Sequence, residues 1–429
     1  MTPHSLAKPS RHDRLSPADA GLLALEERTG APQNVGFVLL FEGSAPTLEE
    51  LTELVRTRLE GLPGHLSRVI GAPLRAGRPV WAHAPDLELA FHVRSEALPG
   101  GEDALERLAA RVLATRLDRA RPLWELTLVV DALPDGFALI VKSHAVLTGG
   151  GLVAALLADA PARATAQPSP PAPVPALLVA DALTSPREAV HAVRALAARA
   201  GERRRTAPSP LAAAGGPLRR LALIDADLAL AQAAKERLGG TVNDVVLAAL
   251  AGGLAAHLRA RSDDPERVAL RALVPVAGAG DGELLAAFAP LPLGTLDARR
   301  RHAEIARALD GLRSSGRAAG ADELRERDGF AAAAMVIDAA RLGARERGFD
   351  ITVANVPGPA RAHRMLGREL RAAHPVIPLA SGRALSVAVL SYRGRLCFGL
   401  LSDGDALPDP AALAAATVQA LAELAPQAR

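Results

Sequence analysis

The sequence reads Val141-Lys142-Ser143-His144-Ala145-Val146-Leu147-Thr148-Gly149-Gly150-Gly151 about a third of the way along the chain. An apolar run ends in a histidine, and a glycine-rich turn precedes a helical pattern, so the stretch predicts strand, turn and helix. A histidine titrates near neutral pH and is suited to removing a proton from an alcohol. Backbone N–H groups in such a turn can bind developing negative charge. On its own, a histidine at a strand end is more often structural.

Outward from this stretch, strand and helix patterns alternate in both halves of the chain. Thr47 and Glu50 have the spacing of a capping box, and the helix they begin ends before Gly61. Thr241 precedes another helix, with Asp244 three residues on. The remaining expected helices are Gly151–Ala158 and Arg301–Gly311. The expected strands are Val35–Phe41, Leu126–Val130, Phe137–Lys142, Val268–Val276, Asp350–Asn355, Leu385–Ser391 and Leu396–Leu401, the second and third joined by the turn Pro134-Asp135-Gly136.

Two linker-like segments divide the chain. Pro161–Pro175 is proline-rich, and Thr206–Pro217 is rich in alanine, glycine and proline. Between them, Pro186–Arg205 has a helical pattern. A chain of 429 residues is too long for one ordinary core. We therefore expect an N-terminal lobe over residues 1–160, a crossing linker with a helix over residues 161–217, and a C-terminal lobe over residues 218–429.

Composition favours a folded protein that does not bind nucleic acid. Hydrophobic residues make up 49% of the chain and charged residues 23%, which is the balance of a globular protein. The formal net charge is only +3 and aromatic residues make up 3%, so a basic surface interleaved with aromatics is not expected. The short runs Arg203–Arg205 and Arg299–Arg301 are expected to be solvated faces, with an anionic lipid surface as the alternative partner.

The sequence also predicts where the protein works. The N-terminal sequence MTPHSLAKPSRHDR lacks the apolar core of a signal peptide, and the apolar stretch Val245–Ala256 is too short to span a bilayer. We expect a cytoplasmic protein whose membrane contact, if any, is peripheral to the inner face. Cys397 is the only cysteine, which excludes an internal disulfide and a cysteine metal site. A buried, inert thiol is expected there.

Several stretches resemble, in order, motifs of the bacterial wax ester synthase/diacylglycerol acyltransferase family. The stretch quoted first is similar to the family's H-H-x-x-x-D-G motif, with His144 on the second, catalytic histidine and Gly149 on the glycine. The resemblance covers almost the whole chain. The other similar stretches are Leu15-Ser16-Pro17-Ala18-Asp19-Ala20, Phe91-His92-Val93-Arg94, Leu117-Asp118-Arg119-Ala120-Arg121-Pro122-Leu123-Trp124-Glu125, Thr241-Val242-Asn243-Asp244-Val245, Ala354-Asn355-Val356-Pro357-Gly358-Pro359, and the tail from Pro375 to Asp403 with Ser391-Tyr392-Arg393-Gly394.

The resemblance implies an α/β (α+β) fold of two chloramphenicol-acetyltransferase-like lobes, condensation-domain-like, with mixed sheets flanked by helices. It implies an acyltransferase that moves a fatty acyl group from acyl-CoA to diacylglycerol or a long-chain alcohol. In this reading His144 is the general base, and Asn243 and the backbone near Gly149 stabilise the oxyanion. Acyl-CoA is a co-substrate, and neither a cofactor nor a metal is expected. The partners are acyl-CoA, a lipid alcohol, and a membrane or lipid-droplet surface.

Other motif residues have structural readings beside the functional ones. Arg94 and Arg121 fit either ion pairs or the phosphates of acyl-CoA, with pairing favoured. Trp124 is expected in core packing rather than against substrate. Asp244 at a helix start is explained by capping, as is its neighbour Asn243. A turn signal explains Asn355, which precedes Val-Pro-Gly-Pro.

Two departures from the family pattern bear on activity. Ser143 stands where the family has its first histidine, and Thr148 stands in place of the aspartate, so Thr148 cannot form an ion pair with an arginine. We therefore expect reduced activity. A catalytically impaired paralogue that binds lipid or a partner, and a superfamily acyltransferase for a specialised metabolite, remain alternatives. Ser143 is not expected to be a nucleophile, because adjacent strand residues point to opposite faces and His144 cannot activate it.

Overall fold

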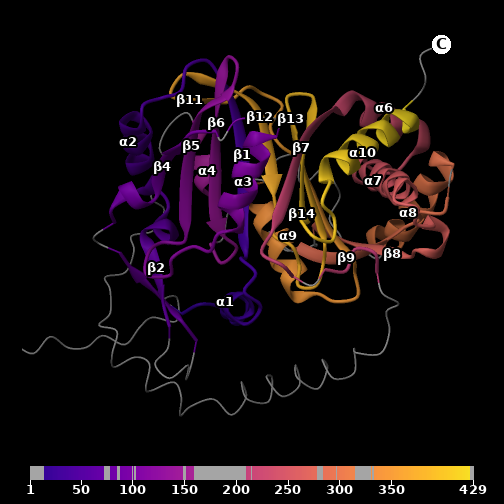
Figure 1. Cartoon of the computed structure of the whole chain (residues 1–429), viewed down its shortest axis with the longest axis horizontal. Helices are drawn as coiled ribbons and strands as arrows, with labels where there is room; N and C mark the ends of the chain where they lie inside the picture. The colour runs from indigo at the N-terminus through magenta and orange to yellow at the C-terminus, as the bar shows by residue number, and fades with distance from the viewer. Residues whose placement is uncertain are drawn as a thin grey trace, which may run out of the picture.

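The fold consists of two six-stranded sheets with helices packed on them (Figure 1). The structure is a computed structural model. It describes the chain apart from residues 1–13, 72–77, 85–86, 99, 101–102, 148–150, 159–208, 214, 278–283, 296, 315–329, 331–332 and 426–429. Parallel and antiparallel strand pairs occur in both sheets. The expected mixed α/β architecture is therefore confirmed.

The first sheet carries the strand that ends in His144. Its order is β11-β12-β1-β6-β5-β4, and β1 lies between β6 and β12, antiparallel to both. A small separate sheet pairs β2 with β3. The bounds are β1 Asn34–Glu42, β2 Ser67–Ile70, β3 Val80–His83, β4 Val93–Glu96, β5 Trp124–Leu133, β6 Gly136–His144, β11 Arg364–Met365 and β12 Arg368–Val376.

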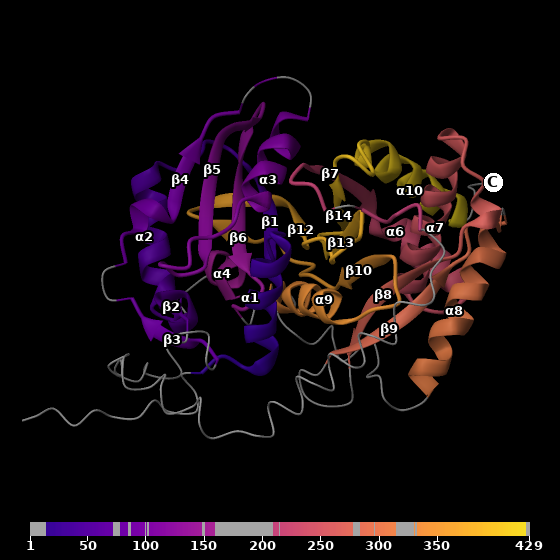
Figure 2. The ribbon, with the colours of Figure 1, turned by 60° about the horizontal axis from the view of Figure 1, so that its bottom comes forward.

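The second sheet comes from the other half of the chain. Its order is β7-β14-β13-β10-β8-β9, so β7 and β9 form its edges. Figure 2 shows the two sheets side by side, with β12 of the first sheet next to β14 of the second. The bounds are β7 Arg219–Asp227, β8 Leu270–Ala277, β9 Leu284–Leu291, β10 Ile351–Val356, β13 Leu385–Tyr392 and β14 Arg395–Asp403.

Helices cover both sheets. In the first half, α2 packs on α4, and α3 packs on β1 and also on β7 of the second sheet. In the second half, α7 packs between α10 and α8. The bounds are α1 Pro17–Thr29, α2 Leu48–Leu59, α3 Ala104–Ala114, α4 Gly151–Leu156, α6 Leu228–Leu238, α7 Val242–Ala260, α8 Ala298–Ser314, α9 Ala333–Arg345 and α10 Pro410–Leu424.

Local sequence signals explain where two of these helices begin. Thr47 and Glu50 form a capping box at α2, with both reciprocal hydrogen bonds present. Thr241 and Asp244 form the same arrangement at α7. Both boxes satisfy backbone N–H groups that a helix start otherwise leaves unpaired. The predicted helix starts at these two positions are confirmed.

Two strands from the C-terminal half of the sequence belong to the first sheet, across the expected lobe boundary. Strands β11 and β12 belong to the C-terminal half in sequence but pair with β1 in the first sheet. The lobe limits at residues 160 and 217 stay a prediction. Most of residues 161–217, including the helix expected over Pro186–Arg205, lies outside the described residues.

The apolar segment Val245–Ala256 is explained by its position in the fold. It forms the middle of α7, and most of its side chains are buried in the core of the second sheet's helical layer. Among the helices described, none alone is long and apolar enough to cross a bilayer. Only α6 and α7 taken together pass by length and composition, and a 104° bend separates them.

Candidate active site

The centre of the candidate site is His144, the last residue of β6. Its backbone N–H donates to the carbonyl of Leu123 (2.9 Å), and its strand partner on β1 is Asn34. The side chain is 1% exposed. The strand before it and α4 after it confirm the predicted strand–turn–helix. Thr148 and Gly149, predicted to support the motif, lie outside the described residues.

Hydrogen bonding assigns the tautomer of the His144 ring. The backbone N–H of Val146 donates to Nδ1 at 3.1 Å, so Nδ1 carries no proton in the neutral ring and Nε2 does. Nε2 is buried and lies 3.6 Å from a carboxylate oxygen of Glu26, beyond hydrogen-bond distance. The ring therefore presents its N–H to an acidic side chain.

Glu26 is held in place by contacts from three sides. It is 3% exposed and sits on α1. Its Oε1 accepts a hydrogen bond from the backbone N–H of Gln33 (3.2 Å), and Arg119 donates to Oε2 (2.9 Å). The other end of the Arg119 guanidinium pairs with the neighbouring Glu27. A buried carboxylate with an arginine and a backbone donor is a stable anion.

These contacts set the ionisation of Glu26. Burial alone would raise the pKa of its carboxyl group. The ring of His144, the guanidinium of Arg119 and the backbone N–H of Gln33 outweigh burial and hold the pKa at about 2, below the ordinary 4.5. Glu26 is therefore a carboxylate at neutral pH, beside the ring for which the family resemblance implies the role of base.

We expect the Glu26 carboxylate to make the free energy of unfolding depend on pH at acidic values. A carboxyl group whose pKa is lowered by folding stabilises the folded state above its ordinary pKa. That contribution is lost as the pH falls from 4.5 towards 2. Free energies of unfolding, measured by urea denaturation across this range, should fall less steeply for Glu26→Gln than for the unsubstituted protein. Equal slopes would show that folding does not lower the pKa of Glu26.

The L-S-P-x-D stretch fixes the helix that carries Glu26. Ser16 caps α1 through the backbone N–H of Asp19 (3.1 Å), and Pro17 is the first helical residue. The Asp19 carboxylate forms an ion pair with Arg341 on α9, from the other half of the chain. The resemblance pointed to this stretch, but nothing local marked Glu26, which reasoning from the sequence missed.

A buried lysine lies on the same face of β6 as His144. Lys142 is fully buried, and its Nζ lies 3.2 Å from a carboxylate oxygen of Glu125 on β5. Burial lowers the pKa of Lys142, and the charge of Glu125 opposes that shift. The other oxygen of Glu125 pairs with Arg94 (2.8 Å). Lys142, Glu125 and Arg94 thus form a chain of ion pairs that begins two residues from His144 and ends at the surface.

This chain of ion pairs ends at a hollow of about 200 Å³. Arg121 lies on its rim, with its guanidinium carbon 3.3 Å from the centre of the Phe91 ring and its Nε 3.7 Å from Asp118. Trp124 is fully buried, donates to the carbonyl of His65 (2.8 Å) and stacks on His92. The structural reading of Trp124 fits these contacts. Binding of substrate by Arg121 or Trp124 stays a prediction.

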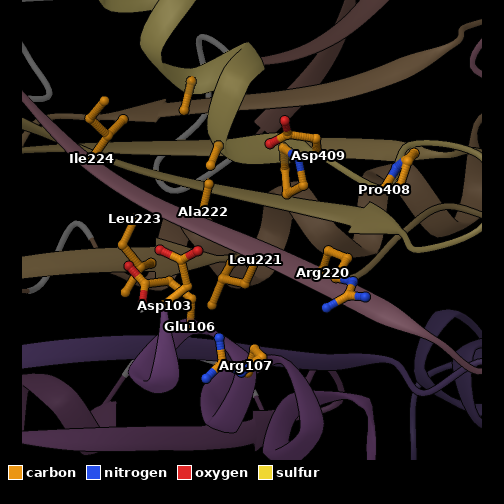
Figure 3. A pocket seen from close by; sticks show the side chains of 13 residues that line it. Asp103, Glu106, Arg107, Arg220, Leu221, Ala222, Leu223, Ile224, Pro408 and Asp409 are labelled. Carbon is orange, nitrogen blue, oxygen red and sulfur yellow. The ribbon is translucent and has the colours of Figure 1, made fainter. Parts of the chain in front are cut away.

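The remaining predicted site residues lie on other elements or on the other face of β6. Asn243 and Asp244 begin α7, which packs on the second sheet's side of the molecule (Figures 1 and 2). Asn355 lies within β10, which ends at Val356. Ser143 faces Trp124 and Val35 in strand register, on the opposite side of β6 from His144. A second hollow, of about 190 Å³, lies between α3, β7 and the start of α10 (Figure 3).

Solved structures define the class to which this fold belongs. The first condensation domain of the CDA synthetase matches 96% of the chain and 95% of its own, with a TM-score of 0.57 at 18% identity. The trichothecene 15-O-acetyltransferase TRI3 of Fusarium sporotrichioides matches with a TM-score of 0.58 at 13% identity, covering 99% of this chain and all of its own. At such identities these likenesses show the fold alone, and it is the two-lobed, condensation-like fold that was expected.

The family follows from closer matches. Residues 15–246 match the wax ester synthase/diacylglycerol acyltransferase catalytic domain, and residues 283–425 match the C-terminal domain of the same family. The chain belongs to this family and is an acyltransferase of its type. A relative in Mycobacterium tuberculosis, described as "Probable diacyglycerol O-acyltransferase tgs1", is 30% identical over 96% of both chains. The wax ester synthase/diacylglycerol acyltransferase from Marinobacter aquaeolei VT8 matches with a TM-score of 0.70 at 26% identity, covering 96% of this chain and 98% of its own.

Proposed function

We propose that the protein transfers a fatty acyl group from acyl-CoA to diacylglycerol or a long-chain alcohol, with His144 as general base. Family membership supports the reaction class, and the named relatives support a lipid acceptor. The observation that carries the role of His144 is the Glu26 carboxylate 3.6 Å from its Nε2. A fixed carboxylate beside an imidazole orients the ring and stabilises the cation formed when it accepts a proton.

The contacts of the ring indicate which nitrogen accepts the proton. Nε2–H faces Glu26, so the lone pair available to a substrate is that of Nδ1, which Val146 now contacts through its N–H. In the proposed reaction the acceptor hydroxyl replaces this N–H at Nδ1. The hydroxyl loses its proton to Nδ1 while its oxygen attacks the thioester carbonyl. The tetrahedral intermediate then breaks its carbon–sulfur bond, and the ring returns the proton to the coenzyme A thiolate.

The developing oxyanion needs hydrogen-bond donors. The N–H of Val146, released from Nδ1, is one candidate among the described residues. The backbone at Gly149 and the side chain of Asn243 stay the candidates predicted from the sequence. No covalent enzyme intermediate is proposed, because the thioester is already activated and Ser143 lies on the opposite face of β6.

The proposed substrates suggest a location for the enzyme in the cell. Diacylglycerol and long-chain alcohols reside in membranes and lipid droplets, so we propose a cytoplasmic enzyme that contacts the inner membrane face or a droplet surface peripherally. The co-substrate acyl-CoA is water-soluble, and the proposed chemistry uses neither a metal nor a further cofactor. Arg94 and Arg121, at the hollow beside Glu125, are proposed to meet its phosphates.

A second candidate function rests on one observation. The ring of His144 is 1% exposed, and its Nδ1 lone pair is already used by Val146. Together with Ser143 and Thr148 in place of two family residues, this favours a paralogue that binds acyl-CoA or lipid without turnover. The two candidates differ in whether substrate reaches Nδ1.

One assay separates these candidates. Purified protein is incubated with labelled palmitoyl-CoA and, in turn, diacylglycerol, hexadecanol and a small polar alcohol. Ester formation with either lipid alcohol is the expected result. Acyl-CoA binding without ester would support the paralogue, and selectivity for the small polar alcohol would support a specialised-metabolite acyltransferase.

A further inference from the structure

Three side chains of the kinds that bind metal ions meet where the two sheets touch, away from His144. They are Asp225 on β7, His374 on β12 and Cys397 on β14. One ligand atom from each lies within 4.8 Å of the other two, and Nε2 of His374 lies 3.5 Å from Oδ1 of Asp225. Both His374 and Cys397 are buried, and Asp225 is partly exposed.

The fold brings these residues together through three strands. Cys397 and Asp225 are directly opposed in the antiparallel pair of β14 and β7. Strand β12 belongs to the first sheet and approaches β14 closely at Gly399, where a side-chain carbon would lie 2.1 Å from the carbonyl oxygen of Pro375. A glycine at that point allows His374 to reach the pair.

Each of the three side chains is also held by a contact on its outer side. Nδ1 of His374 donates to the carbonyl of Phe398 (3.0 Å), which leaves Nε2 without a proton in the neutral ring. The backbone N–H of Ala373 donates to the sulfur of Cys397. Oδ2 of Asp225 accepts from Arg395 (2.8 Å). Outer contacts of this kind orient metal ligands in known sites.

The atoms that face the centre of the cluster have few partners of their own. Oδ1 of Asp225 is buried and has no hydrogen-bond partner among the described residues. It lies 3.5 Å from Nε2 of His374, and the Cys397 thiol, which keeps its proton, hydrogen-bonds to the same carboxylate, so two lone pairs and one thiol meet at one point. Such a convergence is unfavourable unless a cation or shared protons occupy it.

We propose that Asp225, His374 and Cys397 bind a zinc ion. Sulfur, imidazole and carboxylate ligands together favour Zn²⁺ over harder cations such as Mg²⁺ or Ca²⁺. Tetrahedral zinc with ordinary bond lengths places nitrogen and oxygen ligands roughly 3.4 Å apart, and the separation here is 3.5 Å. A fourth position is left for water. The ion would connect β12 of the first sheet to β7 and β14 of the second.

Binding requires the thiol to lose its proton as the zinc–sulfur bond forms, and that proton passes to solvent. Burial raises the pKa of the Cys397 thiol to about 12, so the metal competes with a firmly held proton. Zinc affinity should therefore increase with pH. The sequence alone excluded a cysteine metal site because it has one cysteine. The other two ligands come from distant strands that only the fold brings together.

Metal binding to the full-length chain tests the proposal. Chelator-treated protein is titrated with Co²⁺, whose spectrum shows a thiolate charge-transfer band when sulfur is a ligand, and then with Zn²⁺. We expect one ion per chain, displacement of Co²⁺ by Zn²⁺, and a higher unfolding temperature with Zn²⁺. Cys397→Ser should abolish the charge-transfer band, and Asp225→Asn and His374→Gln should weaken binding by more than about 100-fold.

Asp227→Asn is the matched control, because it removes a carboxylate from the same strand and leaves an asparagine, which also caps α6. It should bind as the unsubstituted chain does. Absence of the charge-transfer band from the unsubstituted chain would overturn the proposal. So would Co²⁺ binding that persists in Cys397→Ser and Asp225→Asn. Circular dichroism of each metal-free variant separates lost ligands from lost folding.

Discussion

Replacing His144 by alanine should lower the turnover number for ester formation by about 1,000-fold, since general acid–base catalysis commonly contributes 100- to 10,000-fold. The ring is the proposed acceptor of the hydroxyl proton and its donor to the leaving thiolate. Glu26 keeps Arg119 and Gln33 as partners after the substitution, so the variant should remain folded. Initial rates with palmitoyl-CoA and diacylglycerol measure the effect.

Two companion variants make this result specific. His144→Gln keeps more of the buried volume, so equal loss of rate in both variants with intact circular dichroism excludes a folding defect. Ser143→Ala changes the adjacent residue, whose side chain lies on the opposite face of β6, and should retain most activity. An unchanged rate in His144→Ala would remove this ring from the mechanism. Loss of rate in Ser143→Ala would instead point to the serine.

Glu26→Gln should lower the turnover number by about 100-fold, the scale at which small errors in positioning affect catalysis. The amide removes the negative charge that faces Nε2, so the protonated ring is stabilised less in the transition state. Glu26 is proposed to position and stabilise His144 rather than to contact substrate. The Michaelis constant for acyl-CoA should therefore stay nearly unchanged while the turnover number falls.

The neighbouring acid offers the matched control. Glu27 pairs with the same arginine, Arg119, but is half exposed, so Glu27→Gln removes one carboxylate of that pair and spares the one at His144. It should keep nearly full activity. Glu26→Asp, which restores the charge on a shorter side chain, should recover part of the rate. If both glutamine variants lose rate equally, the effect comes from Arg119 and the fold of α1, and Glu26 has no separate role.

Local signals in the sequence predicted a good part of the fold. The strand ending in His144 and the capping boxes at Thr47 and Thr241 depend on residues a few positions apart, and all are found as expected. Strand β12 was missed because Arg371 and Pro375 interrupt its apolar pattern. Its strand character comes from pairing with β1, far away in the chain.

In the candidate site, too, local motifs predicted some residues, whereas contacts between distant elements were missed. Motifs placed His144 and Arg119 in stretches that resemble the family, but the contact between Glu26 and His144 depends on how α1 packs beside the end of β6. Asp225, His374 and Cys397 are still more dispersed and share no sequence motif. The spacing of residues in the sequence predicts local structure, such as a single turn or strand. These clusters depend instead on packing between elements that are distant in the sequence.

The position of β12 also bears on how the protein is made. Strand β1 is synthesised well before one of its two neighbours, residues 368–376, which comes far later in the chain. Until then the N–H and C=O groups along one edge of β1 have no partner strand, and an open edge of that kind can pair with other nascent chains. The first sheet is therefore completed only after residues 368–376 have been synthesised.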